Sequence, residues 1–114
     1  MKKSLTSLRR KADALNQKVP DNSKCIVCGQ PAQVRHHFIP KSQSNNLRYD
    51  QQNLVLLCNK CHSRHHLSGD PHIVSTIIEK NGLDWVNGLQ AKRNIICKLS
   101  IGYLEEIIDS LNKE

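Results

Sequence analysis

The sequence predicts a small, mainly α-helical domain with one short β-hairpin, held together by a metal staple and flanked by helices at both ends. Three observations support this prediction. The 114 residues suit a single domain over 1–114. A hydrophobic content of 38%, with one Trp, one Phe and two Tyr, leaves few bulky side chains for a core, so a staple is expected. Two Cys-x-x-Cys pairs, at 25–28 and 58–61, can supply it.

Residues 1–20 are predicted to contain a basic amphipathic helix. Apolar residues recur every three or four positions, which is the spacing of one helix face. These residues are Leu5, Leu8, Ala12, Leu15 and Val19. The basic residues that accompany them, against Asp13 alone, are Lys2, Lys3, Arg9, Arg10, Lys11 and Lys18. Pro20 then breaks the helix.

Two short strands are predicted around a polar segment. The first cysteine pair reads as a tight turn, because Gly29 permits a positive φ and lets backbone amides face sulfur. Residues 32–39 suit a strand that a proline ends. Residues 41–52 are polar and are predicted to form a loop, whereas the apolar run 54–57 suits a buried strand.

The rest of the chain is predicted to be helical. Asn59 can cap a helix that ends near Gly69 and carries a cysteine and three histidines. Three further helices are expected in a C-terminal extension, residues 70–114. Their predicted starts are Asp70-Pro71, Asp84 and Ser100. The last helix has an acidic outer face, so the charge of the chain reverses sign towards its end.

The two cysteine pairs predict a structural zinc site. Two residues between cysteines let one turn present both thiolates about 3.5 to 4 Å apart, as tetrahedral zinc requires. The four predicted ligands are Cys25, Cys28, Cys58 and Cys61. They fill the shell, so zinc bound here would stabilise the fold and leave no position for substrate. Cys97 has no partner in this pattern and is expected to be a core residue.

Whether the cysteines form disulfides or bind metal depends on the cellular compartment in which the protein is found. The N-terminal residues lack the apolar stretch of a secretory signal, and no later run is long enough to span a membrane. A cytoplasmic location is therefore expected, where thiols stay reduced and bind metal.

Five histidines predict a second metal site. His62 and His66 are four residues apart and share one helix face, and His65 could replace His66 as a ligand. His36 and His37 are neighbours on a predicted strand, so their side chains point to opposite faces. One of them can complete a three-ligand site while the other faces substrate.

The charge of the chain favours a polyanionic partner. The 17 Lys and Arg residues exceed the 10 Asp and Glu residues, which gives a net charge of +7 and a pI of about 9.4. Nucleic acid is the natural partner for such a surface, although a solubilising basic surface is the simpler reading.

Together, residues 25–66 resemble the HNH endonucleases, the ββα-metal nucleases of phages, mobile elements and bacterial toxins. The pattern that carries the resemblance is Cys25-x-x-Cys28, His36-His37-x-x-Pro40, then Asn53-Leu54-x-x-Leu57-Cys58-x-x-Cys61-His62-x-x-x-His66. The resemblance implies a zinc-stapled ββα-metal core of treble-clef-like architecture over 25–68. It also implies metal-dependent hydrolysis of DNA in a bacterial or phage-infected cell.

The resemblance implies a role for four of the histidines and for Asn53. His36, His62 and His66 would bind a catalytic divalent metal, His37 would be the general base, and Asn53 would orient the loop that carries the base. Imidazole ligands suit Zn, Ni, Co or Mn better than Mg. What holds the second nitrogen of His37 is left open between Asn53 and a nearby backbone carbonyl. The products would carry 5′-phosphate and 3′-hydroxyl ends.

Four further interpretations concern partners. The candidates for phosphate contacts near the site are Arg35, Lys41, Arg48, Lys60 and Arg64. The N-terminal helix could extend this basic track or serve as scaffold. The alternative function is a non-catalytic zinc module that binds nucleic acid or protein. Finally, residues 70–114 could bind a protein partner or mediate self-association.

Overall fold

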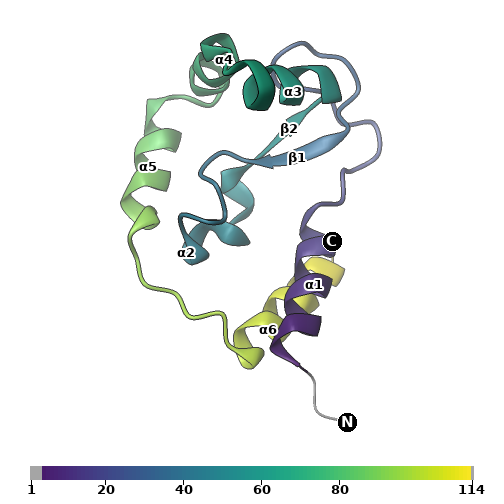
Figure 1. Cartoon of the computed structure of the whole chain (residues 1–114), viewed down its shortest axis with the longest axis vertical. Helices are drawn as coiled ribbons and strands as arrows, with labels where there is room; N and C mark the ends of the chain where they lie inside the picture. The colour runs from purple at the N-terminus through teal and green to yellow at the C-terminus, as the bar shows by residue number, and fades with distance from the viewer. Residues whose placement is uncertain (1–3, 114) are drawn as a thin grey trace.

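The computed structural model describes residues 4–113, so the predicted basic residues Lys2 and Lys3 lie outside the described residues. In chain order the elements are α1 (Leu5–Asn16), β1 (Val34–His37), α2 (Asn45–Arg48), the 3-10 helix η1 (Gln51–Asn53), β2 (Leu54–Leu57), α3 (Asn59–Ser68), α4 (Pro71–Asn81), α5 (Leu83–Arg93) and α6 (Ile101–Asn112). The prediction of a small, mainly helical fold with a two-stranded antiparallel hairpin is confirmed (Figure 1).

The β1–β2 hairpin separates the two neighbouring histidines. His36 pairs with Val55 and His37 pairs with Leu54, so His36 shares a face with a core valine and His37 takes the other face. Helix α3 packs against both strands on the His36 side. The hairpin thereby directs the two imidazoles to different surroundings.

Strand β1 is shorter than the predicted strand 32–39. The amide of Phe38 still bonds to the carbonyl of Asn53, at 2.8 Å, but the amide of Ile39 bonds to the side chain of Asn53 instead of to a strand partner. The strand ends here because the side chain of Asn53, and not a backbone carbonyl of the partner strand, accepts the hydrogen bond from Ile39.

The prediction of a featureless loop over 41–52 is wrong, because this segment contains α2 and η1. Ser44 caps α2 by accepting a hydrogen bond from the amide of Leu47, and Asp50 caps η1 by accepting one from the amide of Gln52. Leu47 is fully buried and anchors the segment. Polar residues that read as a loop therefore act here as caps around one apolar anchor.

Helix ends confirm three predicted boundaries and correct three others. Asp70 with Pro71 begins α4, Ser100 begins α6, and Gly69 ends α3 with φ of 60°. Asn59 is not the cap of α3, because the sulfur of Cys58 accepts the hydrogen bond from the amide of Cys61.

The other two corrections concern α1 and α5. Helix α1 ends at Asn16, which leaves Val19 outside the helix. Helix α5 begins after Gly82 without a side-chain cap, so Asp84 lies within its first turn and is not the cap.

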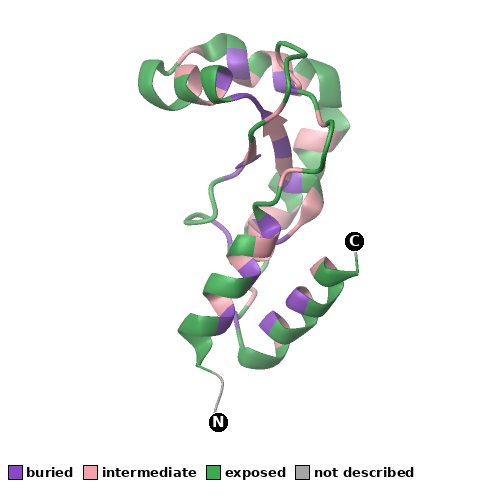
Figure 2. Ribbon diagram, turned by 90° about the vertical axis from the view of Figure 1, so that its right-hand side faces the viewer, coloured by how far each residue is buried: buried purple, intermediate pink, exposed green. Residues whose placement is uncertain are grey.

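The apolar core consists of three small clusters. One surrounds the cysteines between the hairpin, α3 and α4; its members are Cys25, Val55, Leu57, Cys58, Cys61, Ile73 and Ile77. Another joins α1, α6 and Tyr49 through Leu8, Ala12, Leu99, Leu104 and Ile108, and the third joins Ile39, Leu47 and Leu89. Figure 2 shows these buried positions spread along the whole molecule. Such a divided core agrees with the expected need for a staple.

The helices of the C-terminal extension pack against the earlier elements of the chain. Helix α4 packs on α3, α5 packs on α2, and α6 packs on α1, so the extension follows an arc (Figure 1). The acidic helix α6 therefore lies beside the basic helix α1 of the same chain. Within residues 4–113, no helix has the length and apolar character needed to cross a membrane.

Candidate active site and metal centres

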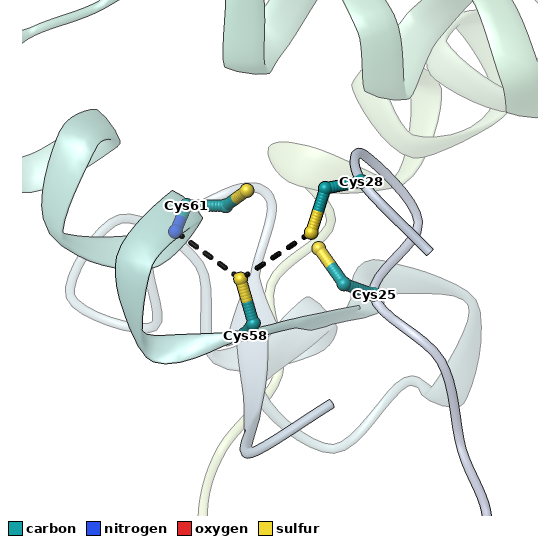
Figure 3. A group of neighbouring side chains, drawn as sticks. All are labelled: Cys25, Cys28, Cys58 and Cys61. Atoms are coloured by element: carbon teal, nitrogen blue, oxygen red, sulfur yellow. Dashed lines mark hydrogen bonds between the residues drawn. The ribbon is translucent and has the colours of Figure 1, made fainter. Parts of the chain in front are cut away.

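The four predicted zinc ligands lie together. Their sulfur atoms are all within 4.8 Å of one another, and the sulfurs of Cys28 and Cys58 are 3.6 Å apart (Figure 3). One pair comes from the turn after α1 and the other from the junction of β2 and α3. All five cysteines of the chain are free thiols. Tetrahedral zinc with Zn–S bonds of about 2.3 Å places its sulfur ligands about 3.5 to 4 Å apart. The sulfur–sulfur distances of this group are similar, so the four cysteines fit zinc.

The backbone around the cysteines favours thiolates. Gly29 has a φ of 77°, as predicted for the tight turn. Burial raises the pKa of Cys25, but backbone amides of Val27, Cys28 and Cys58 outweigh burial and lower it to about 7. Burial raises the pKa of Cys61, which is 1% exposed. Because a bound cation offsets the cost of burying thiolates, this candidate zinc site is suited to an ion.

A second group of ligand atoms comes from β1 and α3. The ring nitrogens of His36, His62 and His66 all lie within 4.8 Å of one another. The ring centroids of His62 and His66 are 4.5 Å apart, and that of His36 is 5.3 and 5.2 Å from them. The ring of His65 is also near, 4.9 Å from that of His36, but the close nitrogen group contains His66. The geometry thus favours His66 over His65.

The surroundings of His36 and His62 favour their neutral forms. Burial and, after it, charge repulsion from the neighbouring histidines together lower the pKa of His36 to about 3. Burial, followed by repulsion from its neighbours, also lowers the pKa of His62. Neutral imidazoles present lone pairs to a cation, so this donor set fits a divalent metal of the Zn, Ni, Co or Mn type.

His37 is held by a backbone carbonyl. Its Nε2 lies 2.8 Å from the oxygen of Arg48. A carbonyl oxygen can only accept, so Nε2 carries the proton and Nδ1 of the neutral ring keeps a free lone pair. Burial lowers the pKa of His37, although the hydrogen bond to the Arg48 carbonyl opposes this shift. The net lowering of the pKa favours the neutral imidazole.

Asn53 fixes the loop that follows β1. It is completely buried, its Oδ1 accepts from the amide of Ile39, and its Nδ2 donates to the carbonyls of Ile39 and Leu47. These bonds tie the two ends of the segment between β1 and α2. Of the two partners left open for His37, the backbone carbonyl is thus the one observed, and Asn53 acts on the loop.

The histidines line a common pocket of about 350 Å³. Its walls are Gln17, Val34, Arg35, His36, His37, Pro40, Lys41, His62 and His66. Sequence reasoning missed Gln17, which caps the end of α1. No pattern in the sequence marks it, because its place depends on how α1 docks against residues 48–51, far along the chain.

The predicted phosphate-binding residues differ in their availability. Lys41 is exposed and lines the histidine pocket, whereas Lys60 is exposed beside the cysteines. Arg35 donates to Gln51 and to the carbonyl of Lys18. Two others are in ion pairs, Arg48 with Asp13 and Arg64 with Asp70, each at 2.6 Å. These ion pairs offset the charge that the two arginines could offer to a phosphate.

Cys97 lies apart from both metal-ligand groups. It is half-buried in the segment between α5 and α6, so the expectation of a core residue holds only in part. Its carbonyl accepts a hydrogen bond from Asn45, at 3.3 Å.

Comparison with known families agrees with this geometry. Residues 25–68 match the family model described as HNH endonuclease, which is less than half of the chain. No curated protein and no solved structure shows significant similarity to the chain. The matched segment contains both cysteine pairs, the hairpin and helix α3. Residues 25–68 are therefore similar to the HNH endonuclease family.

Proposed function

We propose that the chain is a metal-dependent endonuclease that hydrolyses phosphodiester bonds in DNA, with His37 as the general base. The observation that carries this proposal is the placement of His37 in one pocket with the close nitrogen group of His36, His62 and His66. The match of residues 25–68 to the HNH endonuclease family supports it, because HNH nucleases act on DNA.

The proposed base is His37 because its Nδ1 lone pair is available. The Arg48 carbonyl holds Nε2 and its proton, so a water molecule on the pocket side can give its proton to Nδ1. The water oxygen then attacks the phosphorus, and the bond to the leaving oxygen breaks. Asn53 supports this step indirectly by holding the loop on which the His37 side chain rests.

A divalent metal would be held by His36, His62 and His66, and the candidates are Zn, Ni, Co, Mn and Mg. When bound, such an ion stabilises negative charge on the phosphate and on the leaving oxygen. The four cysteines would hold a separate zinc. Their four sulfurs complete its shell, so its contribution is to folding.

Lys41 is proposed to contact a DNA phosphate at the rim of the pocket. It is exposed, and its charge lies close enough to His37 to lower the pKa of that imidazole. Lys41→Ala should weaken DNA binding about equally for all sequences and reduce the slope of log affinity against log salt by about 1. Fluorescence anisotropy at several salt concentrations measures both effects.

Lys80→Ala is the matched control, because Lys80 is an exposed lysine at the end of α4 that lies outside the histidine pocket. A Lys41→Ala salt dependence indistinguishable from that of Lys80→Ala would exclude Lys41 from the interface.

Cleavage of plasmid DNA tests the proposed function. The zinc-loaded chain should convert supercoiled plasmid to nicked or linear forms with at least one of Mg, Mn, Ni, Co or Zn, and EDTA should stop the reaction. Linear, single-stranded and branched DNA in parallel reactions would define the preferred substrate. Intact plasmid with every metal, under conditions in which another HNH enzyme cuts, would refute the proposal.

The cellular setting stays a prediction. A cytoplasmic location, a bacterial or phage origin, and binding of a protein partner or self-association through residues 70–114 rest on the sequence alone.

A further inference from the structure

The carbonyl that holds His37 has a second hydrogen-bond donor, and this donor lies outside the HNH segment. Asn16, the last residue of α1, donates from Nδ2 to the oxygen of Arg48 at 3.0 Å. The same oxygen accepts from Nε2 of His37 at 2.8 Å. Asn16 is only 1% exposed, and its contact with Arg48, 32 residues away in the chain, is part-buried and depends on the docking of α1.

We propose that Asn16 is a positioning residue for the catalytic base, so that helix α1 is part of the catalytic apparatus. This inference rests on the proposed nuclease function of the same site. Asn16 is not among the residues that line the histidine pocket, to which this end of α1 contributes Gln17. It acts through the Arg48 carbonyl, which sets the direction in which the His37 ring points.

In the hydrogen-bond network around Asn16, the donor and acceptor role of each group is fixed. The Arg35 guanidinium can only donate, and it donates to Oε1 of Gln51. Gln51 must then use Nε2 to donate, and Oδ1 of Asn16 accepts at 2.8 Å. Asn16 is left with Nδ2 facing the Arg48 carbonyl, which can only accept. Since both ends of the network are fixed, the amide of Asn16 has one orientation and its donor always points at the carbonyl of Arg48.

Helix α1 holds the same segment a second time. Asp13, one turn before Asn16, accepts from Nε and Nη2 of Arg48 at 3.0 and 2.6 Å and from the hydroxyl of Tyr49 at 2.8 Å. Residues three apart lie on the same helix face. Asp13 thus holds the side chains of this segment while Asn16 holds its backbone. With two such contacts, the Arg48 carbonyl has little freedom to turn away from His37.

Kinetics of Asn16→Asp tests the inference. Aspartate has nearly the same shape and can still accept from Gln51, but it has no donor for the Arg48 carbonyl. The turnover rate at saturating DNA should fall about 10- to 100-fold, because misplacing a catalytic group by about 1 Å has effects of this size. The KM for DNA should stay within about twofold, because a side chain that is 1% exposed does not touch DNA.

Two further variants separate positioning from stability. Asn16→Ala removes the donor without adding a charge, and it should show the same change in turnover if Asn16→Asp folds poorly. Ile108→Ala weakens the packing of α6 on α1 from the other helix and leaves the network intact. Once activity is expressed per folded molecule, Ile108→Ala should turn over at the wild-type rate, even if its melting temperature falls as far as that of the Asn16 variants.

Nitrogen NMR of the histidine side chains provides a readout that does not require cleavage. In the zinc-loaded wild-type chain, His37 should be the Nε2–H tautomer with a hydrogen-bonded proton. In Asn16→Ala, the His37 signals should broaden or shift towards a mixture of tautomers, whereas those of the exposed His72 should not change.

The inference fails if the Asn16 variants turn over like wild type, or lose no more than Ile108→Ala, and it also fails if the His37 tautomer is unchanged in them. A wild-type chain that cuts no DNA would instead refute the proposed nuclease function. In that case the NMR comparison would still decide whether Asn16 positions His37.

Discussion

His37→Ala is expected to lower the rate of DNA cleavage by about 100- to 10,000-fold, the contribution typical of a positioned general base. The substitution removes the Nδ1 lone pair that would take the proton from water. It leaves the cysteines and the group of His36, His62 and His66 in place. Single-turnover cleavage with excess enzyme measures the loss directly.

The matched control for this substitution is His72→Ala. His72 is an exposed histidine on α4 whose side chain contacts Thr76, away from the histidine pocket. Both variants should keep the wild-type zinc content and melting temperature to within a few degrees. If His37→Ala cut DNA within a few-fold of the wild-type rate, His37 would not be the base.

Cys61→Ser is expected to abolish both zinc binding and cleavage. Cys61 is a member of the four-sulfur group, lies in the first turn of α3 and directly precedes His62. Structural zinc contributes about 10–16 kcal/mol of apparent binding energy in zinc-finger peptides, and this energy stabilises the fold. With a core divided into three small clusters, the variant should unfold at a much lower temperature. Differential scanning fluorimetry, zinc analysis and the plasmid assay together measure the outcome.

Cys97→Ser tests whether the effect is specific to the four-sulfur group. Cys97 is half-buried and lies between α5 and α6, so its replacement should leave zinc content and cleavage at wild-type levels. A Cys61→Ser variant that kept its zinc and its melting temperature would show that these cysteines do not staple the fold.

Much of the candidate site could be predicted because metal ligands obey local spacing. The Cys-x-x-Cys pairs and the four-residue interval from His62 to His66 fix which side chains share a turn or a helix face. The alternation of a strand placed His36 and His37 on opposite faces, which the hairpin register confirms. These features depend only on residues that are close together in the chain, so they can be predicted from the sequence.

The surroundings of His37 could not be predicted because they depend on distant contacts. Arg48 was expected to contact phosphate, but its side chain pairs with Asp13 from α1, 35 residues earlier, and its carbonyl holds His37. Asn16 and Gln17 carry no recognisable pattern. The prediction of a loop over 41–52 is wrong because polar residues that cap short helices, with a single apolar residue among them, have the same composition as an ordinary loop.

The two ligand groups share a boundary at the start of α3. Cys61 belongs to the sulfur group and the next residue, His62, belongs to the nitrogen group. Loss of zinc should therefore displace the helix that carries His62 and His66, while loss of the second metal should leave the helix in place. On the proposed function, the two metals would differ in function although their ligands are adjacent.

Metal content measured together with cleavage tests this two-metal account most directly. The chain is purified with zinc, treated with a mild chelator until one zinc per molecule is left, and titrated with Mn while plasmid cleavage is followed. The account predicts no cleavage with one zinc, cleavage that rises as a second metal binds, and a constant zinc content throughout. Full cleavage with one metal per chain would contradict the account. The absence of cleavage after a second metal has bound would contradict it as well.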